Sequence, residues 1–239
     1  MKAVWTLTLA TALLALGSVV VFSQPETSRS VIARIEGTVV MDGVRLEPSA
    51  SRFPLSANSV VHTENGRVEI MLASGDALFL GENSSVRMSD NGVLNFSRFE
   101  ILTGSAVVIT RGYGPAVVCL EEVRLSDSGV FRFDVHLVAD QKFCRVRVYK
   151  GAAAGQMPSA LLLLANGQTT ELNRLCGDHT GKNEFNIEDI DDLDRWSRQR
   201  AASDAASAES HTFRPLAQKA SGNVPLPINP ARQDALSRV

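Results

Sequence analysis

Short turn sequences between runs of alternating apolar residues constrain this chain more than any other feature. Asn-Gly and Asp-Gly pairs tolerate the positive φ angles of tight turns, and their twist matches that of the strands they join. These pairs and similar Ser/Gly turns occur at Asp42-Gly43, Asn65-Gly66, Ser74-Gly75-Asp76, Asn91-Gly92, Ser126-Asp127-Ser128-Gly129 and Asn166-Gly167. This spacing predicts an all-β domain of hairpins, arranged as an antiparallel sandwich or a solenoid-like stack.

The runs between the turns have the two-residue period of strands that bury one face. In one of them Phe131 and Phe133 share a face, opposite Arg132 and Asp134. The runs that we expect to be strands include residues 31–41, 44–46, 67–72, 77–80, 106–109, 116–125, 130–137, 143–149, 161–164 and 169–172. We therefore expect one β domain over residues 31–175.

The first 23 residues differ in character from the rest of the chain. Lys2 precedes an uncharged run from residue 3 to residue 22, and Val21 and Ser23 suit cleavage before Gln24. This pattern predicts a secretory signal peptide over residues 1–23. The alternative is an uncleaved N-terminal anchor, because the run is long enough to span a bilayer. Either interpretation predicts an exported protein, periplasmic or extracellular, with membrane attachment only if the segment is uncleaved.

Charge and motifs favour neither a nucleic-acid partner nor an enzyme. The net charge is −2, and no Lys/Arg cluster of the kind that binds nucleic acid occurs. The chain lacks a Gly-x-Ser-x-Gly elbow, a Walker loop, a His-Glu-x-x-His motif and a dinucleotide fingerprint. Cys176 and His179 have a C-x-x-H spacing, but a metal site needs further ligands that the sequence does not supply nearby. We expect no catalytic residues, no cofactor and no metal.

Three cysteines leave the disulfide pairing open. Cys119, Cys144 and Cys176 allow one disulfide and one free thiol in an oxidising compartment, with three choices of pair. Cys119 and Cys144 both lie in strand-like runs and form the candidate pair that we name. The alternative is that they are small buried apolar residues.

A change of composition after the β region predicts a helix over residues 186–208. Asn186 suits the N-cap, with Asp189 three residues later as an acidic variant of a capping box. Ile190, Leu193 and Trp196 form a narrow apolar stripe at helical spacing. We expect this stripe to dock the helix on the β domain, and the alternative is that it contacts a partner.

The last segment, residues 209–239, is rich in proline and in small polar residues. Its prolines are Pro215, Pro225, Pro227 and Pro230. Such a composition cannot bury a core, so we expect a disordered tail.

The order of short motifs along the β region resembles that of a FecR domain. The residues that carry the resemblance are 35–39, 55–63, 67–81, 83–86, 102–108, 129–133, 146–151 and 164–168. Each motif consists of glycine and apolar spacing, and their order over the whole region makes the likeness. Residues 193–200 are similar to the helix that follows such domains in exported bacterial proteins.

The resemblance implies a non-catalytic domain with no active-site residues to transfer. FecR regulators of iron uptake carry a cytoplasmic anti-sigma segment before a membrane helix. Only two residues precede the apolar run here, so we expect no such segment. We expect a protein-interaction or sensing module in the bacterial cell envelope, with an envelope protein as its unknown partner. The alternative is a carbohydrate or envelope-polymer binding module, which the low content of two Trp and two Tyr disfavours.

Overall fold

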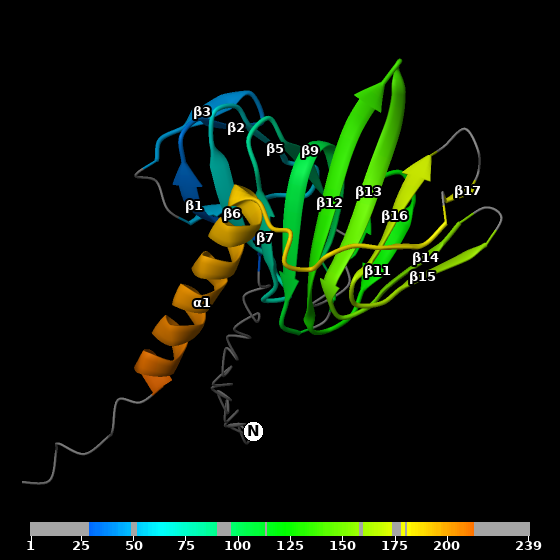
Figure 1. The fold of residues 1–239 in the computed structure, drawn as a ribbon. Coiled ribbons are helices and arrows are strands. Elements are labelled where there is room, and N and C mark those ends of the chain that lie inside the picture. Colours follow the sequence, from blue (N-terminus) through cyan, green and yellow to red (C-terminus); the bar gives the residue numbers. More distant parts are fainter. Residues whose placement is uncertain are drawn as a thin grey trace, which may run out of the picture.

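In the part of the chain that the structure describes, two β-sheets share one long strand, and a single helix packs on one outer face (Figure 1). The computed structural model describes residues 29–48, 52–89, 97–112, 114–157, 160–173, 178–179 and 181–212. The expected signal segment, the Asn91-Gly92 turn, Cys176 and the chain from residue 213 on lie outside these residues. The mostly β architecture with one C-terminal helix confirms the expected fold class.

The sheet beneath the helix, here called the helix-side sheet, is antiparallel throughout. Its order is β4 (Phe53–Pro54), β1 (Val31–Glu36), β6 (Arg67–Met71), β7 (Ala77–Leu80), β9 (Arg98–Thr110), β12 (Gly129–Val138), β13 (Gln141–Lys150) and β16 (Gln168–Asn173). The short strands β17 (Asp178–His179) and β18 (Asn183–Glu184) both pair with β16.

The second sheet, here called the opposite sheet, contains one parallel pair, β9 with β10. Its order is β3 (Val44–Leu46), β2 (Val39–Met41), β5 (Val60–Thr63), β8 (Ser85–Ser89), β9, β10 (Ala116–Val118), β11 (Glu122–Leu125), β14 (Ala153–Gln156) and β15 (Leu161–Leu164).

Strand β9 passes from one sheet to the other at Gly104. Before Gly104 the strand pairs with β8 and β10, and after it with β7 and β12. Gly104 has a φ of 80°, and a Cβ there would lie 2.3 Å from the Ser84 Oγ. Only glycine fits this crossing, because it tolerates the positive φ and the close backbone approach.

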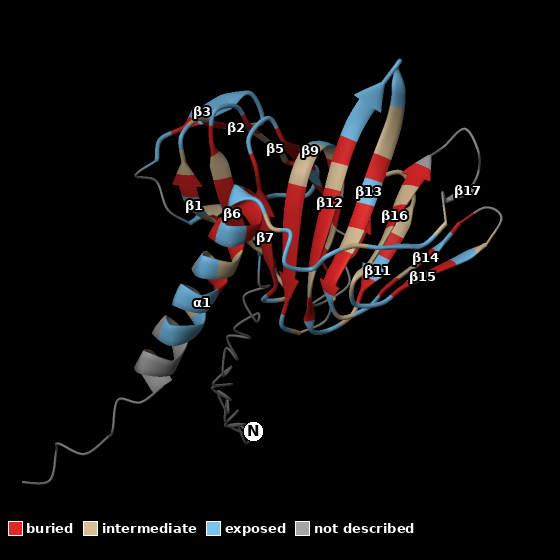
Figure 2. Ribbon diagram, in the orientation of Figure 1, coloured by how far each residue is buried: buried red, intermediate tan, exposed pale blue. Residues whose placement is uncertain are grey.

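One apolar core fills the space between the sheets, and a smaller one lies under the helix. The main core takes alternate residues of both sheets, including Phe99, Phe131 and Phe133. Strand β7 is buried on both faces, because Leu78 belongs to the main core and Phe79 to the helix-side cluster. Figure 2 shows this burial, and it shows the exposed tip of the β12–β13 hairpin.

Several predicted hairpin turns are corners between the two sheets. Asp42-Gly43 and Gly75 do join paired strands. Asn65-Gly66 instead leads from β5 in the opposite sheet to β6 in the helix-side sheet. The turns from β11 to β12 and from β15 to β16 make the same crossing, so the predicted hairpins at these positions are wrong. Turn residues predict that the chain reverses direction, but they do not predict with which strand the following strand pairs.

The helix α1 (Asp192–Thr212) begins later than the predicted residue 186 and extends past 208. Asn186 forms a separate turn, because its Oδ1 accepts the Glu188 N–H at 3.1 Å. The capping box lies five residues further on, where Asp191 accepts the Asp194 N–H at 3.0 Å and Asp194 accepts the Asp191 N–H at 3.2 Å. Among the residues that the structure describes, no helix has the length and apolar character to cross a bilayer.

Candidate functional site

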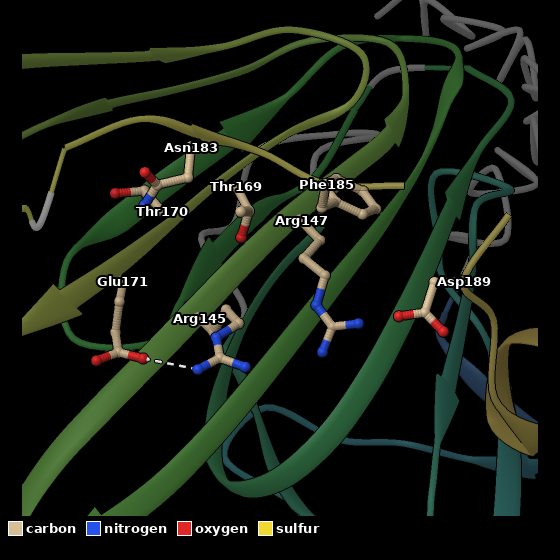
Figure 3. Close-up of a pocket in the computed structure, with 8 residues that line it drawn as sticks. All are labelled: Arg145, Arg147, Thr169, Thr170, Glu171, Asn183, Phe185 and Asp189. Carbon is tan, nitrogen blue, oxygen red and sulfur yellow. Dashed lines mark hydrogen bonds and ion pairs between the residues drawn. The ribbon is translucent and has the colours of Figure 1, made fainter. Parts of the chain in front are cut away.

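A polar hollow of about 420 Å³ lies on the outer face of the helix-side sheet, beside the N-terminus of α1 (Figure 3). Strands β13 and β16 form its floor, and the segment that leads from β18 to the helix forms its rim. Its lining residues are Arg145, Arg147, Thr169, Thr170, Glu171, Asn183, Phe185 and Asp189.

Arg145 and Arg147 supply the positive charge of the hollow. They lie two residues apart on β13, so both side chains point to the outer face. Arg145 Nη2 lies 3.2 Å from Glu171 Oε2 on β16, and its side chain is about half exposed. Arg147 Nη2 donates to Asp134 Oδ2 on β12 at 2.9 Å. The hollow therefore offers two guanidinium groups to the solvent side, each held by a carboxylate.

A buried arginine continues this arrangement toward the helix. Arg132 lies on the outer face of β12 and is 5% exposed. Its Nε donates to Asp134 Oδ1 at 2.9 Å, and its Nη1 lies 2.9 Å from Asp194 Oδ2 and 2.6 Å from Asp191 Oδ2. The two carboxylates that cap α1 thus bind the same guanidinium, which ties the start of the helix to the sheet.

The chain of ion pairs runs without a break from the hollow to the helix. Arg147 binds Asp134, Asp134 binds Arg132, and Arg132 binds Asp194. Tyr149 joins from β13, where its hydroxyl donates to Asp194 Oδ2 at 3.0 Å. We call these five residues the ion-pair relay.

Burial and charge shift the acidity of groups at this site. Burial and the neighbouring Asp194 carboxylate raise the pKa of Tyr149 to about 12, so its hydroxyl stays protonated and continues to donate. Burial alone would raise the pKa of Asp191. The Asp194 N–H and the Arg132 guanidinium outweigh it and lower that pKa, which keeps the capping carboxylate charged.

Further along α1, a second set of contacts docks the helix on the sheet. Trp196 is 8% exposed, its ring lies edge-on to Phe79 with centroids 5.4 Å apart, and its Nε1–H donates to Glu36 at 3.1 Å. Arg200 Nε donates to the buried Glu69 Oε2 at 2.9 Å. Burial and the nearby Asp204 raise the pKa of Glu69 despite this contact.

Of the three residues expected to dock the helix, two lie within α1 and one precedes it. Leu193 and Trp196 belong to the apolar cluster with Phe79, so they face the sheet. Ile190 precedes the first turn and is half-buried. Trp196 therefore contacts the β domain in this structure.

The cysteines and the candidate metal spacing lie away from this site. Cys119 and Cys144 form a disulfide within the main core, with their Cα atoms 5.9 Å apart. Cys176 and the side chain of His179 lie outside the described residues. Among the side chains that the structure does place, no group of three or more His, Cys, Asp or Glu residues is arranged to hold a metal ion.

The sequence alone does not predict the ion-pair relay, although the alternation of charged residues on β12 and β13 is a signal for it. Arg145 and Arg147 alternate with Val146 and Val148 in a strand pattern, and Arg132 and Asp134 do the same on β12. Charged residues repeated on one face of two neighbouring strands indicate a polar outer face. The strand pairing that places Asp134 opposite Arg145, and the docking of Asp194 onto it, could not be read from that pattern.

No protein-family model matches this chain, and neither does any curated protein sequence. The chain does have a distant structural similarity to a solved protein. Two crystal structures of a "putative anti-sigma factor" from Parabacteroides distasonis match it with TM-scores of 0.43 and 0.42, at 16% and 18% sequence identity. The matches cover 54% and 56% of this chain, and 61% and 60% of those chains. The chain thus spans less than two thirds of the proteins it matches.

Proposed function

We propose that this chain is an exported, non-catalytic FecR-like module that binds an envelope protein and passes that binding event to helix α1. The observation that carries the proposal is the ion-pair relay, which joins an open polar hollow to the N-terminus of a docked helix. The FecR-like motif order and the Cys119–Cys144 disulfide, a bond typical of oxidising compartments, support the assignment.

The relay gives binding a route to the helix. A partner carboxylate that pairs with Arg147 competes with Asp134 for the same guanidinium. Asp134 then loses its contact with Arg147, and this changes its ion pair with Arg132. Arg132 in turn holds the carboxylates of Asp191 and Asp194 at the start of the helix. A protein partner fits this hollow, because arginine is enriched at protein interfaces, where its planar guanidinium makes several hydrogen bonds.

A charge reversal in the hollow tests the binding role. Purified wild-type protein, Arg145→Glu and Arg87→Glu are each used to capture partners from an envelope extract. The control is matched, because Arg87 also forms a cross-strand ion pair, with Glu100 at 2.8 Å, and has a similar exposure of 44% against 48%. We expect one protein to be retained by wild type and Arg87→Glu and lost by Arg145→Glu. Equal retention by wild type and both variants, or retention of glycan alone, contradicts the proposal.

The coupling to the helix needs its own measurement. In a Trp5→Phe background Trp196 is the sole tryptophan, and its fluorescence reports its contacts with Phe79 and Glu36. When the hollow residues are unchanged, we expect binding of the captured partner to shift the emission wavelength of Trp196. Binding without any shift in emission would mean that the protein is an interaction module only, and it would refute the coupling to α1.

Export is tested by fractionation and intact mass of the native protein. We expect the mass of a chain that starts at Gln24, in the periplasmic fraction. Full-length protein in the membrane fraction would show that residues 1–23 act as an anchor. Protein found only in the cytoplasm contradicts the envelope assignment.

A further inference from the structure

Strand β15 (Leu161–Leu164) forms an open edge of the opposite sheet. It pairs with β14 from Gln156↔Leu161 to Ala153↔Leu164, and no other strand in the described part of the chain pairs with it. Leu162 and Leu164 face the core, whereas Leu161 and Leu163 are 57% and 51% exposed. An unpaired edge strand that carries exposed leucines is a template for another strand.

The backbone of β15 tells which of its residues are open to a new strand. Across the β14–β15 turn, the Met157 N–H donates to the Ala160 carbonyl at 2.9 Å. Backbone polar groups alternate in direction along an antiparallel strand, so those of Leu162 and Leu164 point toward β14. The N–H and C=O groups of Leu161 and Leu163 therefore point away from the sheet, on the same residues whose side chains are exposed.

An apolar groove lies beside this edge, at the end of the opposite sheet where β11 and β15 lead into the helix-side sheet. Its volume is about 530 Å³. Ala154 lies between Arg124 on one neighbouring strand and Leu163 on the other, because the three residues are in register. This places a short side chain between two longer ones, and Leu163 lines the groove on the edge side.

The segment of residues 224–228, Val-Pro-Leu-Pro-Ile, has the pattern of a strand that can pair on one side only. Val224, Leu226 and Ile228 keep their N–H groups, and all three lie on one face of an extended chain. Pro225 and Pro227 lack an N–H, but in a strand their nitrogens point away from the edge that the other three residues face. Proline is tolerated in a sheet at just such outer positions of an edge strand.

We infer that residues 224–228 of a second copy of this chain add as a strand to the free edge of β15. Paired residues of antiparallel strands share a face, so Leu226 and its apolar neighbours at 224 and 228 would cover Leu161 and Leu163. The segment lies 12 or more residues beyond Thr212, the end of α1. Figure 1 shows α1 leaving the β-sheets on the side away from β14 and β15, which favours a neighbouring molecule as the source of the segment.

Two tail substitutions test the pairing without touching the folded domain. Leu226→Pro removes the N–H that would face β15, whereas Pro225→Ala changes a residue that faces away. We expect wild type and Pro225→Ala to form dimers by light scattering, with the amides of Leu161 and Leu163 exchanging hydrogen about tenfold or more slowly than in Leu226→Pro. Leu226→Pro should be a monomer, and dilution of wild type should speed exchange at both amides.

A synthetic peptide of residues 222–229 completes the test when it is added to full-length Leu226→Pro protein. It should restore slow exchange at Leu161 and Leu163. Equal mass and equal exchange in all three proteins would overturn the inference. Dimers that persist in Leu226→Pro would show that another surface, such as a second β15, covers the edge. Protection that does not change on dilution would place the tail of the same molecule there, which also overturns the inference.

Discussion

Arg132 shows how a single residue joins the sheet to the helix. Its guanidinium is buried and holds Asp134, Asp191 and Asp194 within 2.9 Å. The Asp194 carboxyl is itself buried, and its Oδ1 has no hydrogen-bond partner in the structure. A buried carboxylate is tolerated only while its counter-charge is present, so the docked helix depends on Arg132.

Replacement of Arg132 by methionine should therefore be costly. The variant keeps much of the side-chain volume but leaves Asp194 buried without its counter-charge, and we expect a loss of about 3 kcal/mol in unfolding free energy. Arg145→Met is the control, because it breaks an exposed pair worth less than about 1 kcal/mol. Urea unfolding of the two variants measures both effects. Equal losses would show that Arg132 contributes no more than a surface pair.

Asp76 provides a prediction about pH. Burial raises its pKa, although the Arg111 N–H and the Ser74 hydroxyl donate to its carboxylate at 2.7 Å each. The folded protein thus holds this proton at pH values where the unfolded chain has lost it. The contribution of Asp76 to the unfolding free energy therefore falls as the pH rises from the ordinary pKa range of aspartate to the raised pKa of the folded protein. Above that pKa the contribution is constant.

Asp76→Asn should remove that slope while keeping an oxygen for Arg111. The unfolding free energy of the variant minus that of wild type should increase over this pH window and then level off. Urea titrations at a series of pH values measure the difference. A difference that decreases with pH would reverse the predicted sign, and a flat one would show that the pKa of Asp76 is unchanged by folding.

At the scale of the element, α1 is held mainly by what it packs against. Its apolar contacts come from Leu193, Trp196 and Ala201, while much of its described outer surface is exposed. A helix with so few apolar residues gains little from propensity alone and depends on tertiary packing. The capping box at Asp191 and Asp194 sets where it begins, and the same carboxylates dock it.

Trp196→Ala should undock the helix and lower the unfolding free energy by about 3 kcal/mol, because the change removes the packing on Phe79 and leaves a cavity. Protease cleavage within α1 should become faster in the same variant. Arg195→Ala is the matched control, since its side chain is 58% exposed. An unchanged melting temperature in Trp196→Ala would show that Trp196 is not an anchor and would favour a partner-binding role for it.

At the scale of the molecule, the chain passes repeatedly between the two sheets. β5 leads to β6, β11 to β12 and β15 to β16, each time from the opposite sheet to the helix-side sheet. The Cys119–Cys144 disulfide adds a covalent link between them, because Cys119 follows β10 in the opposite sheet and Cys144 lies in β13. Many contacts are therefore distant in sequence, which predicts slow folding.

Loss of the disulfide should destabilise the whole domain. The two cysteines are 25 residues apart, and closing such a loop in the unfolded chain contributes about 3.5 kcal/mol in the chain-entropy treatment. A Cys119→Ala/Cys144→Ala variant should lose this amount in urea unfolding. Wild type with reductant should fall toward the same value. Cys176→Ala is the control, and a reductant effect that persists in the double variant would contradict the role of this pair.

The local pattern of the sequence determined the strands and their buried faces. Phe131 and Phe133 face the core as their spacing predicts, because side chains alternate along a strand whatever its partners. Asp42-Gly43 forms its hairpin for a similarly local reason, since both residues take the positive φ angles that the turn needs. The sequence places the cap of α1 five residues too early, because Asn186 and Asp191 both suit an N-cap and only the docking of Asp191 on Arg132 distinguishes them.

Long-range packing sets which strands pair and which groups meet on the outer faces. Asn166-Gly167 has a hairpin sequence, yet β15 pairs with β14 and β16 with β13, so that Leu162 and Leu172 reach the same core from opposite sheets. The ion-pair relay likewise brings together Arg147, Asp134 and Asp194 from three elements. Local sequence sets the direction of each side chain, whereas the partners it meets are set by long-range packing that acts over the whole domain.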